Sequence, residues 1–157
     1  MPHTDAYWRQ THLGRTMVLA LERFNQRVLE LMAHDPLAPM TLMRLATRRQ
    51  ISATHIHLLQ HLPTTGARLT TLARDAAMSK QAMAQAISQC LAWGLVEQRP
   101  DPIDQRARLV VFTDLGLTWL GVYNHAVAKA EEEFNQLAGN EIATVVKLGL
   151  EAYAGGG

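Results

Sequence analysis

The chain has 157 residues, enough for one compact domain with an apolar core. Hydrophobic residues make up 48% and charged residues 18%, which is typical of a globular protein and too apolar for a disordered one. The single cysteine excludes an internal disulfide framework and a four-cysteine zinc site, and fits a cytoplasmic protein. No run reaches the roughly 18 apolar residues of a membrane span, and the start lacks a signal-peptide pattern.

Charge is unevenly distributed, although the formal net charge is only +1. Residues 1–36 carry four basic and four acidic side chains, residues 37–112 carry nine basic and four acidic, and residues 113–157 carry two basic and six acidic. A basic middle segment favours a polyanionic partner, because each neutralised phosphate releases counterions. Chance clustering on a solvated surface is the alternative reading.

The N-terminal segment predicts one long helix. Apolar residues recur at spacings of three and four, so residues 4–32 are expected to form a single helix capped by Thr4. Such a helix is longer than a small core needs, which favours packing against a second subunit. Pro36 and Pro39 then interrupt the chain before a short helix over residues 42–46.

The remaining chain predicts helices on either side of a β-hairpin. The first three expected elements are a helix over residues 52–62, a short helix capped by Thr70 or Thr71, and a longer helix from Ser79 to about Trp93, ended by Gly94. The next are strands over residues 95–99 and 107–112, a helix from Thr113 to about Leu137, and a last helix after Gly139 with apolar positions Ile142, Val145, Val146 and Leu150.

The two helices around residue 77 form a predicted helix-turn-helix. The second of them has an apolar inward face and a polar outward face that carries one cation and no acid. The inward residues are Met83, Ala86, Ile87, Cys90 and Leu91, and the outward residues are Ser79, Lys80, Gln81, Gln85, Ser88 and Gln89. Glutamine and lysine reach base edges in a DNA major groove. An ordinary polar helix surface is the alternative.

Arginines gather around the tip of the predicted hairpin. Arg99, Arg106 and Arg108 lie there, and Asp104 is expected to orient the Arg106 guanidinium. An oriented arginine on a narrow ribbon suits a minor groove, where the potential is most negative; a surface turn with a weak ion pair is the alternative. Together these elements predict a mainly α fold with a small β-hairpin wing, a winged helix-turn-helix.

The sequence resembles the MarR family of bacterial transcriptional regulators. The resemblance rests on Leu69-Thr70-Thr71-Leu72-Ala73, Gly94-Leu95-Val96-Glu97-Gln98-Arg99, Asp101-Pro102-Ile103-Asp104-Gln105-Arg106-Ala107-Arg108-Leu109-Val110 and Thr113-Asp114-Leu115-Gly116. It implies N- and C-terminal dimerisation helices (residues 1–36 and 113–154) around a DNA-binding domain (residues 51–112). It further implies a homodimer that binds a pseudo-palindromic operator in double-stranded DNA and is often released by a small, frequently aromatic effector.

Two departures from the family pattern concern DNA binding. Ala77 stands where the family often has glycine, so the turn is expected to avoid a positive φ. The outward face of the second helix also lacks the arginine common in relatives, which leaves the operator sequence open.

The resulting interpretation is a DNA-binding transcriptional regulator, a repressor without catalytic activity. The candidate phosphate contacts are Arg68, Arg74, Lys80, Arg99 and Arg108. A winged-helix module for protein interaction or dimerisation, without its own operator, is the alternative. A DNA-mobility shift with the region upstream of its own gene separates the two.

Several other residues suggest more specific chemistry. His57 and His61 have a workable metal-ligand spacing, but no glutamate on that helix completes a hydrolase motif, so satisfied or solvated histidines are favoured over a regulatory metal or an enzyme. Cys90 lies on the apolar face, which favours core packing over redox sensing. The candidate effector-binding residues are His12, Arg15 and His55.

Overall fold

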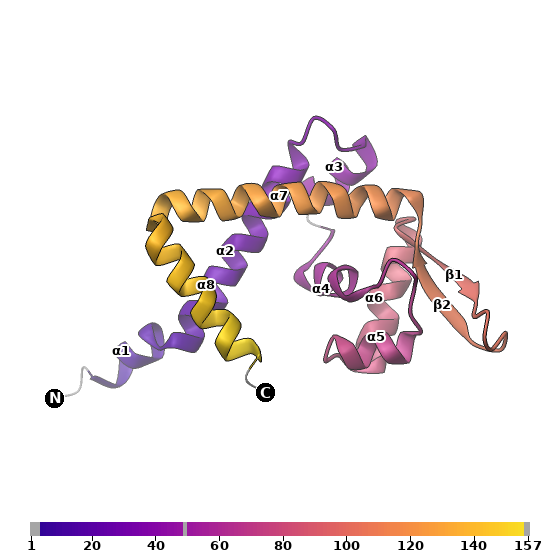
Figure 1. Cartoon of the computed structure of the whole chain (residues 1–157), viewed down its shortest axis with the longest axis horizontal. Helices are drawn as coiled ribbons and strands as arrows, with labels where there is room; N and C mark the ends of the chain where they lie inside the picture. The colour runs from indigo at the N-terminus through magenta and orange to yellow at the C-terminus, as the bar shows by residue number, and fades with distance from the viewer. Residues whose placement is uncertain (1–3, 49, 156–157) are drawn as a thin grey trace. The chain divides into compact units, whose positions relative to one another are not determined.

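The computed structural model describes residues 4–48 and 50–155 (Figure 1). The chain divides into two compact units. The first unit combines the described part of residues 1–28 with the segment from Asn124 onward, and the second runs from Leu29 to Tyr123. Among the described residues, no helix has the length and apolar character required to cross a lipid bilayer.

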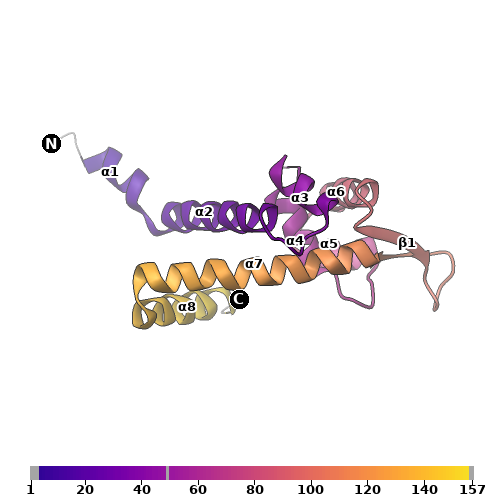
Figure 2. The same cartoon turned by 90° about the horizontal axis from the view of Figure 1, so that it is seen from above.

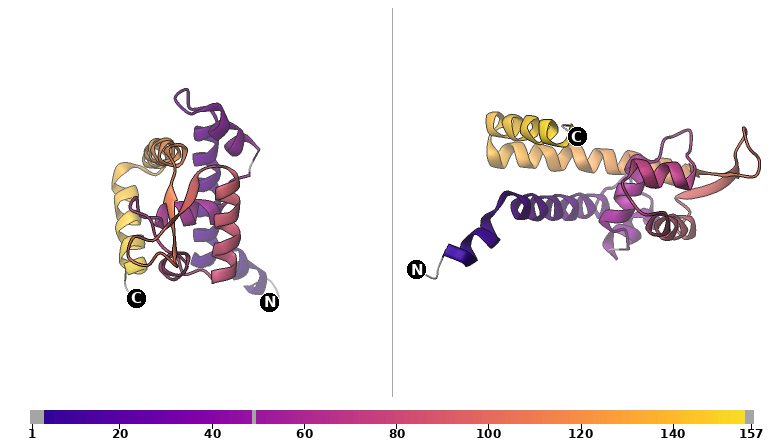
Figure 3. Two further views of the ribbon diagram at one scale, coloured as in Figure 1. Left: turned by 90° about the vertical axis from the view of Figure 1, so that its right-hand side faces the viewer. Right: turned by 90° about the horizontal axis from the view of Figure 1, so that it is seen from below.

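The second unit is a winged helix-turn-helix, which confirms the predicted fold class. It contains the end of α2 (Leu13–Ala33), α3 (Met40–Thr47), α4 (Ala53–His61), α5 (Leu69–Asp75), α6 (Lys80–Ala92), β1 (Val96–Pro100), β2 (Arg108–Phe112) and the start of α7 (Asp114–Ala138). The two strands pair antiparallel, with Val96 opposite Phe112 and Pro100 opposite Arg108. The hairpin extends away from the helices of its own unit (Figures 2 and 3).

Side chains from every helix of the second unit form its apolar core. Leu58, Leu72, Met83 and Leu95 are each at most 1% exposed, so the spacings of three and four in the sequence do mark inward faces. Trp119 is also buried and stacks on Tyr123 with ring centroids 4.9 Å apart. Of the other two tryptophans, Trp93 is half-buried and Trp8 is exposed.

A polar junction joins the start of α7 to the end of α6. The Thr113 hydroxyl donates to the Gly94 carbonyl at 2.5 Å and accepts from the Gly116 N–H at 3.0 Å. Gly94 has φ +74, as its predicted place at the helix end requires. Gly116 lies so close to Leu95 that a Cβ atom there would be 1.9 Å from the Leu95 carbonyl oxygen. The junction therefore depends on the hydroxyl of Thr113, the positive φ of Gly94 and the missing side chain of Gly116.

Three local predictions were wrong. Residues 4–32 form two helices, α1 (Thr4–Thr11) and α2, because the His12 side chain accepts a hydrogen bond from the Arg15 N–H and caps α2. Neither Thr70 nor Thr71 caps α5, which begins at Leu69 with Arg68 in the N-cap position. The third wrong prediction concerns Ala77 and is described below. The capping role expected of Thr4 lies outside the described side chains.

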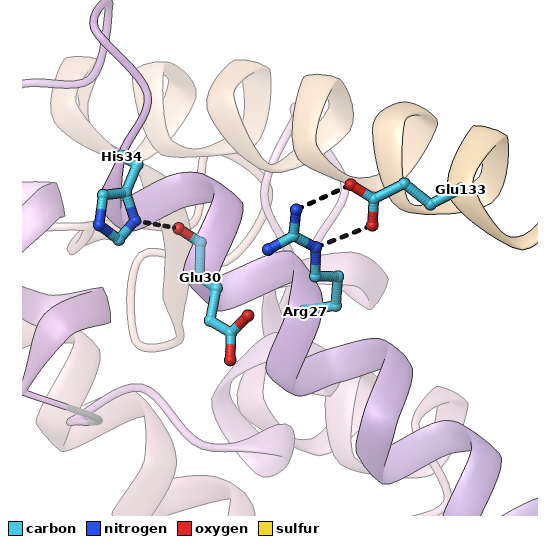
Figure 4. A network of polar contacts seen from close by, with 4 residues as sticks. All are labelled: Arg27, Glu30, His34 and Glu133. Atoms are coloured by element: carbon cyan, nitrogen blue, oxygen red, sulfur yellow. Dashed lines mark hydrogen bonds and ion pairs between the residues drawn. The ribbon is translucent and has the colours of Figure 1, made fainter.

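The first unit contains α1, most of α2, the second part of α7, and α8 (Asn140–Gly155). Within it, Arg27 donates two hydrogen bonds of 2.8 Å to the Glu133 carboxylate, which fixes α2 against α7 (Figure 4). Figure 4 also shows His34 bonding to the Glu30 carbonyl within α2 and the turn after it.

Candidate nucleic-acid interface

The turn between α5 and α6 fixes how α6 is presented. Ala77 has φ +53, a left-handed conformation, whereas the sequence led us to expect a turn without a positive φ. The Met78 N–H then bonds to the Ala73 carbonyl at 2.8 Å. Ser79 accepts a hydrogen bond from the Ala82 N–H at 3.1 Å, which confirms its predicted role as the N-cap of α6.

Helix α6 has the two faces that the sequence predicts. Met83, Ala86, Ile87 and Cys90 are buried against the core. The polar residues are all exposed: Ser79, Lys80, Gln81, Gln85, Ser88 and Gln89. No acidic residue lies on α6 to repel a phosphate. The exposed amides and hydroxyls can therefore donate and accept hydrogen bonds at base edges.

The turn of the hairpin is held by its own hydrogen bonds. Asp101 is buried and accepts from the Ile103 N–H at 2.8 Å. Arg68 donates to the same carboxylate, with its Nε 2.7 Å from Oδ2. These two bonds lower the pKa of Asp101, the backbone bond from Ile103 contributing most. Residues 101–107 are therefore a fixed loop, anchored to the start of α5.

Asp104 does not orient the Arg106 guanidinium, which corrects the prediction. Its side chain accepts from the Arg106 backbone N–H at 3.1 Å, and its carbonyl accepts from the Ala107 N–H at 2.9 Å. Asp104 therefore shapes the backbone of the turn, in the manner of an Asx-turn. The Arg106 side chain is exposed at this turn and has no ion pair among the described residues.

The candidate phosphate contacts fall into two groups. Arg68, Arg74 and Arg99 each pair with a carboxylate, those of Asp101, Asp75 and Glu97 respectively. Within the described part of the chain, no ion pair involves Lys80, Arg106 or Arg108. The exposed pairs are worth at most about 1 kcal/mol, so a phosphate can replace the carboxylate in them. The pair with Asp101 differs because its carboxylate is buried.

Sequence reasoning missed the role of Asp101. It lies 33 positions after Arg68, and no local spacing connects the two residues. The sequence feature that could have indicated this role is that Asp101 begins the segment 101–110, on which the family resemblance rests. The importance of Gly116 could have been found in the same way, because it also belongs to a resembling segment.

The three candidate effector-binding residues do not share one environment. His12 and Arg15 lie in the first unit, where both are exposed and the His12 ring lies 5.9 Å from that of Trp8. His55 lies in the second unit and is 5% exposed. Both of its ring nitrogens have hydrogen-bond partners, Ser52 and Gln89.

In each histidine of the pair with metal-ligand spacing, one ring nitrogen is hydrogen-bonded to a backbone carbonyl. His57 Nε2 lies 2.6 Å from the Ala76 carbonyl oxygen, and His61 Nδ1 lies 2.8 Å from the His57 carbonyl oxygen. In residues 4–48 and 50–155, no three His, Cys, Asp or Glu side chains gather as metal ligands would. Cys90 is fully buried, and burial raises the pKa of its thiol to about 12. It is therefore a core side chain.

Comparison with known proteins places this geometry in a structural class. No protein-family model matches the sequence, and no curated protein matches it either. Among solved structures, the transcriptional repressor CouR bound to a 23-mer DNA duplex is similar, with 21% identity over 90% of this chain and 92% of that chain (TM-score 0.63). A mutant MarR from E. coli in complex with operator DNA has 14% identity over 94% and 96% (TM-score 0.68).

The PcaV transcriptional regulator from Streptomyces coelicolor, in complex with its natural ligand, is similar as well. It has 19% identity over 94% of this chain and 95% of that chain (TM-score 0.61). These similarities establish that the chain has the winged helix-turn-helix fold of MarR-type regulators.

Proposed function

We propose that this chain is a transcriptional regulator that binds double-stranded DNA, with α6 in the major groove and the hairpin in the minor groove. One observation carries the proposal: an acid-free polar face on α6 and an arginine on an anchored turn belong to the same unit. CouR and MarR, which share this fold, are bound to DNA in their solved structures.

Each contact has a distinct role in this proposal. Gln81 and Gln85 read base edges, while Ser79 and Lys80 at the N-terminus of α6 contact bases or phosphate. Arg106 enters the minor groove and Asp104 holds its backbone. The remaining cations contact phosphates: Arg68, Arg74, Arg99 and Arg108.

We propose a homodimer as the DNA-binding species. In the first unit, α8 has a row of apolar side chains that the chain leaves exposed: Ile142, Val145, Leu148 and Tyr153 are 59–76% exposed. Large apolar residues exposed together on one helix mark an interaction surface. Two copies would present two winged helices to a pseudo-palindromic operator.

We also propose that the protein is a cytoplasmic, ligand-responsive repressor without catalytic activity. The family resemblance suggests a small, often aromatic ligand as the effector, and the structure of PcaV in complex with its natural ligand supports a ligand response. His12 and Arg15 are the exposed candidates for binding it, and His55 would contribute only by exchanging one of its present partners. Release of bound DNA by a panel of aromatic acids tests this response.

Selection of bound DNA from a random pool at physiological salt tests the central proposal. We expect two half-sites related by twofold symmetry, with centres about 10 base pairs or one helical turn apart. A failure to enrich any sequence would contradict DNA reading and favour the protein-interaction module. A DNA-mobility shift with the region upstream of its own gene provides an independent check.

A further inference from the structure

A buried histidine of α4 contacts the exposed face of α6. His55 is 5% exposed, and its ring lies 4.7 Å from the Trp93 ring in an edge-on contact. Its Nδ1 lies 2.9 Å from both the backbone nitrogen and the hydroxyl of Ser52. Its Nε2 lies 2.5 Å from Oε1 of Gln89, which is on the polar face of α6. One imidazole therefore links the N-cap of α4 to the candidate recognition helix.

The Ser52 backbone determines the tautomer of the ring. A backbone N–H can only donate, so the Nδ1 atom of His55 must accept this bond and carries no proton. In the neutral ring the proton is then on Nε2. The partner of Nε2 must therefore be an acceptor, which makes Oε1 of Gln89 the atom that faces His55.

This arrangement fixes the direction of the Gln89 amide. Its oxygen accepts from a buried ring, which holds the amide in one orientation while the NH2 group and the second lone pair of Oε1 stay available to a ligand. A glutamine pairs with adenine through both atoms, because its oxygen accepts from N6 while its nitrogen donates to N7. With Oε1 bonded to His55, Gln89 can present both atoms to a base only in the orientation that this bond allows.

We infer that His55 is a specificity-determining positioning residue, which holds the Gln89 amide in one orientation toward DNA. Gln89 then reads one base position with a fixed donor and a fixed acceptor, instead of presenting its amide in several rotamers. This inference rests on the proposed function. The sequence places Gln89 on the predicted DNA face and His55 among the candidate effector-binding residues, and no local spacing connects the two.

The test compares the base preferences of four proteins selected from the same random DNA pool. Gln89→Ala locates the base that Gln89 reads, because preference is lost there. His55→Leu releases the Gln89 amide from this orientation, and we expect the base preference at that position to weaken roughly fivefold or more. His55→Gln supplies the glutamine of a standard capping box and an amide donor toward Gln89, so the wild-type preference should return.

His61→Leu is the matched control, because His61 is an exposed histidine on the same helix that bonds only within α4; its preferences should equal those of the wild type. Circular dichroism checks that each variant is folded. The inference is overturned if His55→Leu selects the same bases as the wild type, or if Gln89→Ala changes no position. If the wild type enriches no DNA, the proposed function fails instead.

A measurement without DNA covers the case in which His55→Leu does not fold. Nitrogen NMR of the imidazole in the intact protein reports which ring nitrogen carries the proton. We expect a proton on Nε2 and none on Nδ1 at neutral pH. A ring protonated on Nδ1 alone would turn the Gln89 amide around and overturn the inference.

Discussion

Ala77 has a backbone conformation that its own side chain disfavours. With φ +53, its Cβ approaches the following carbonyl, which costs about 1–2 kcal/mol relative to glycine. Ala77→Gly removes this strain. It also raises the conformational entropy of the unfolded chain, which lowers the free energy of unfolding by about 0.4–1 kcal/mol. We expect a net gain of about 0.5–1 kcal/mol in the free energy of unfolding, measured by chemical denaturation.

The control for this gain is Ala84→Gly in the middle of α6, where the alanine is exposed and helical. Glycine there should lower the free energy of unfolding by about 1 kcal/mol. Equal destabilisation by both substitutions would show that residue 77 carries no strain. The sequence shows that alanine replaces the glycine often found here in the resembling family. It does not show that this alanine adopts the positive φ that glycine would have.

Gly116 is required for contact rather than for backbone freedom. A Cβ atom there would lie 1.9 Å from the Leu95 carbonyl oxygen and 2.9 Å from the Phe112 ring. Gly116→Ala must therefore push α7 away from the end of α6, and we expect it to destabilise the protein by about 1–3 kcal/mol in thermal or chemical denaturation.

Gly121→Ala is the matched substitution in the same helix. Nothing lies within 4 Å of a Cβ at that position, and the residue is exposed. Alanine should stabilise α7 there by about 0.5–1 kcal/mol, because it loses less backbone entropy than glycine. If both alanines stabilise the protein, the close approach at Gly116 is not a constraint.

At the scale of elements, the sequence predicts best what local chemistry determines. Ser79 and Gly94 bound α6 because a hydroxyl cap and a positive φ are properties of single residues. The break between α1 and α2 was missed because histidine rarely caps a helix, yet His12 does so through Nδ1. The anchor of the hairpin was missed because Arg68 and Asp101 are far apart in the chain.

The ion pair that anchors the hairpin should make its stability depend on pH. The pKa of Asp101 in the folded protein is lowered below the unfolded value of about 3.9. The stabilisation from its ionised form is therefore fully present above pH of about 4, and it is lost as the pH falls through the lower folded pKa.

Asp101→Asn removes this dependence while preserving the shape of the side chain. The wild type should be more stable than the variant at pH 6, and the difference should shrink steadily below a pH of about 4. Urea denaturation at several pH values measures both curves. A difference that stays constant down to a pH of about 2 would show that Asp101 is not stabilised by ionisation.

At the scale of the whole molecule, the exposed apolar face of α8 bears on oligomeric state. Val145 is 69% exposed in the single chain. If a second copy covers it, Val145→Glu buries an unpaired charge and weakens the dimer by several kcal/mol. We expect monomers in sedimentation velocity at micromolar concentration, with a helical far-UV spectrum retained.

Leu37→Glu is the control for this substitution, since Leu37 is 83% exposed and lies in the other unit. It should leave the sedimentation coefficient unchanged. Equal effects of both substitutions would indicate general surface disturbance, and no effect of either would remove α8 from the dimer interface.

The dimer and the hairpin together predict a salt dependence. Each phosphate charge that a protein neutralises contributes about 0.9 to the slope of log affinity against log salt. A dimer carries two copies of Arg106, so Arg106→Ala should reduce the slope by about 2, whereas a monomer would lose about 1. Because phosphates are present at every site, affinity should fall nearly uniformly across DNA sequences.

Lys147→Ala is the matched control, because it removes a cation from α8 in the acidic C-terminal segment. Fluorescence anisotropy between about 50 and 200 mM salt gives both slopes. An unchanged slope for Arg106→Ala would place the hairpin away from the phosphates. A reduction of about 1 would place a single hairpin on the DNA even if the free protein is a dimer, because only a twofold complex loses both charges at once.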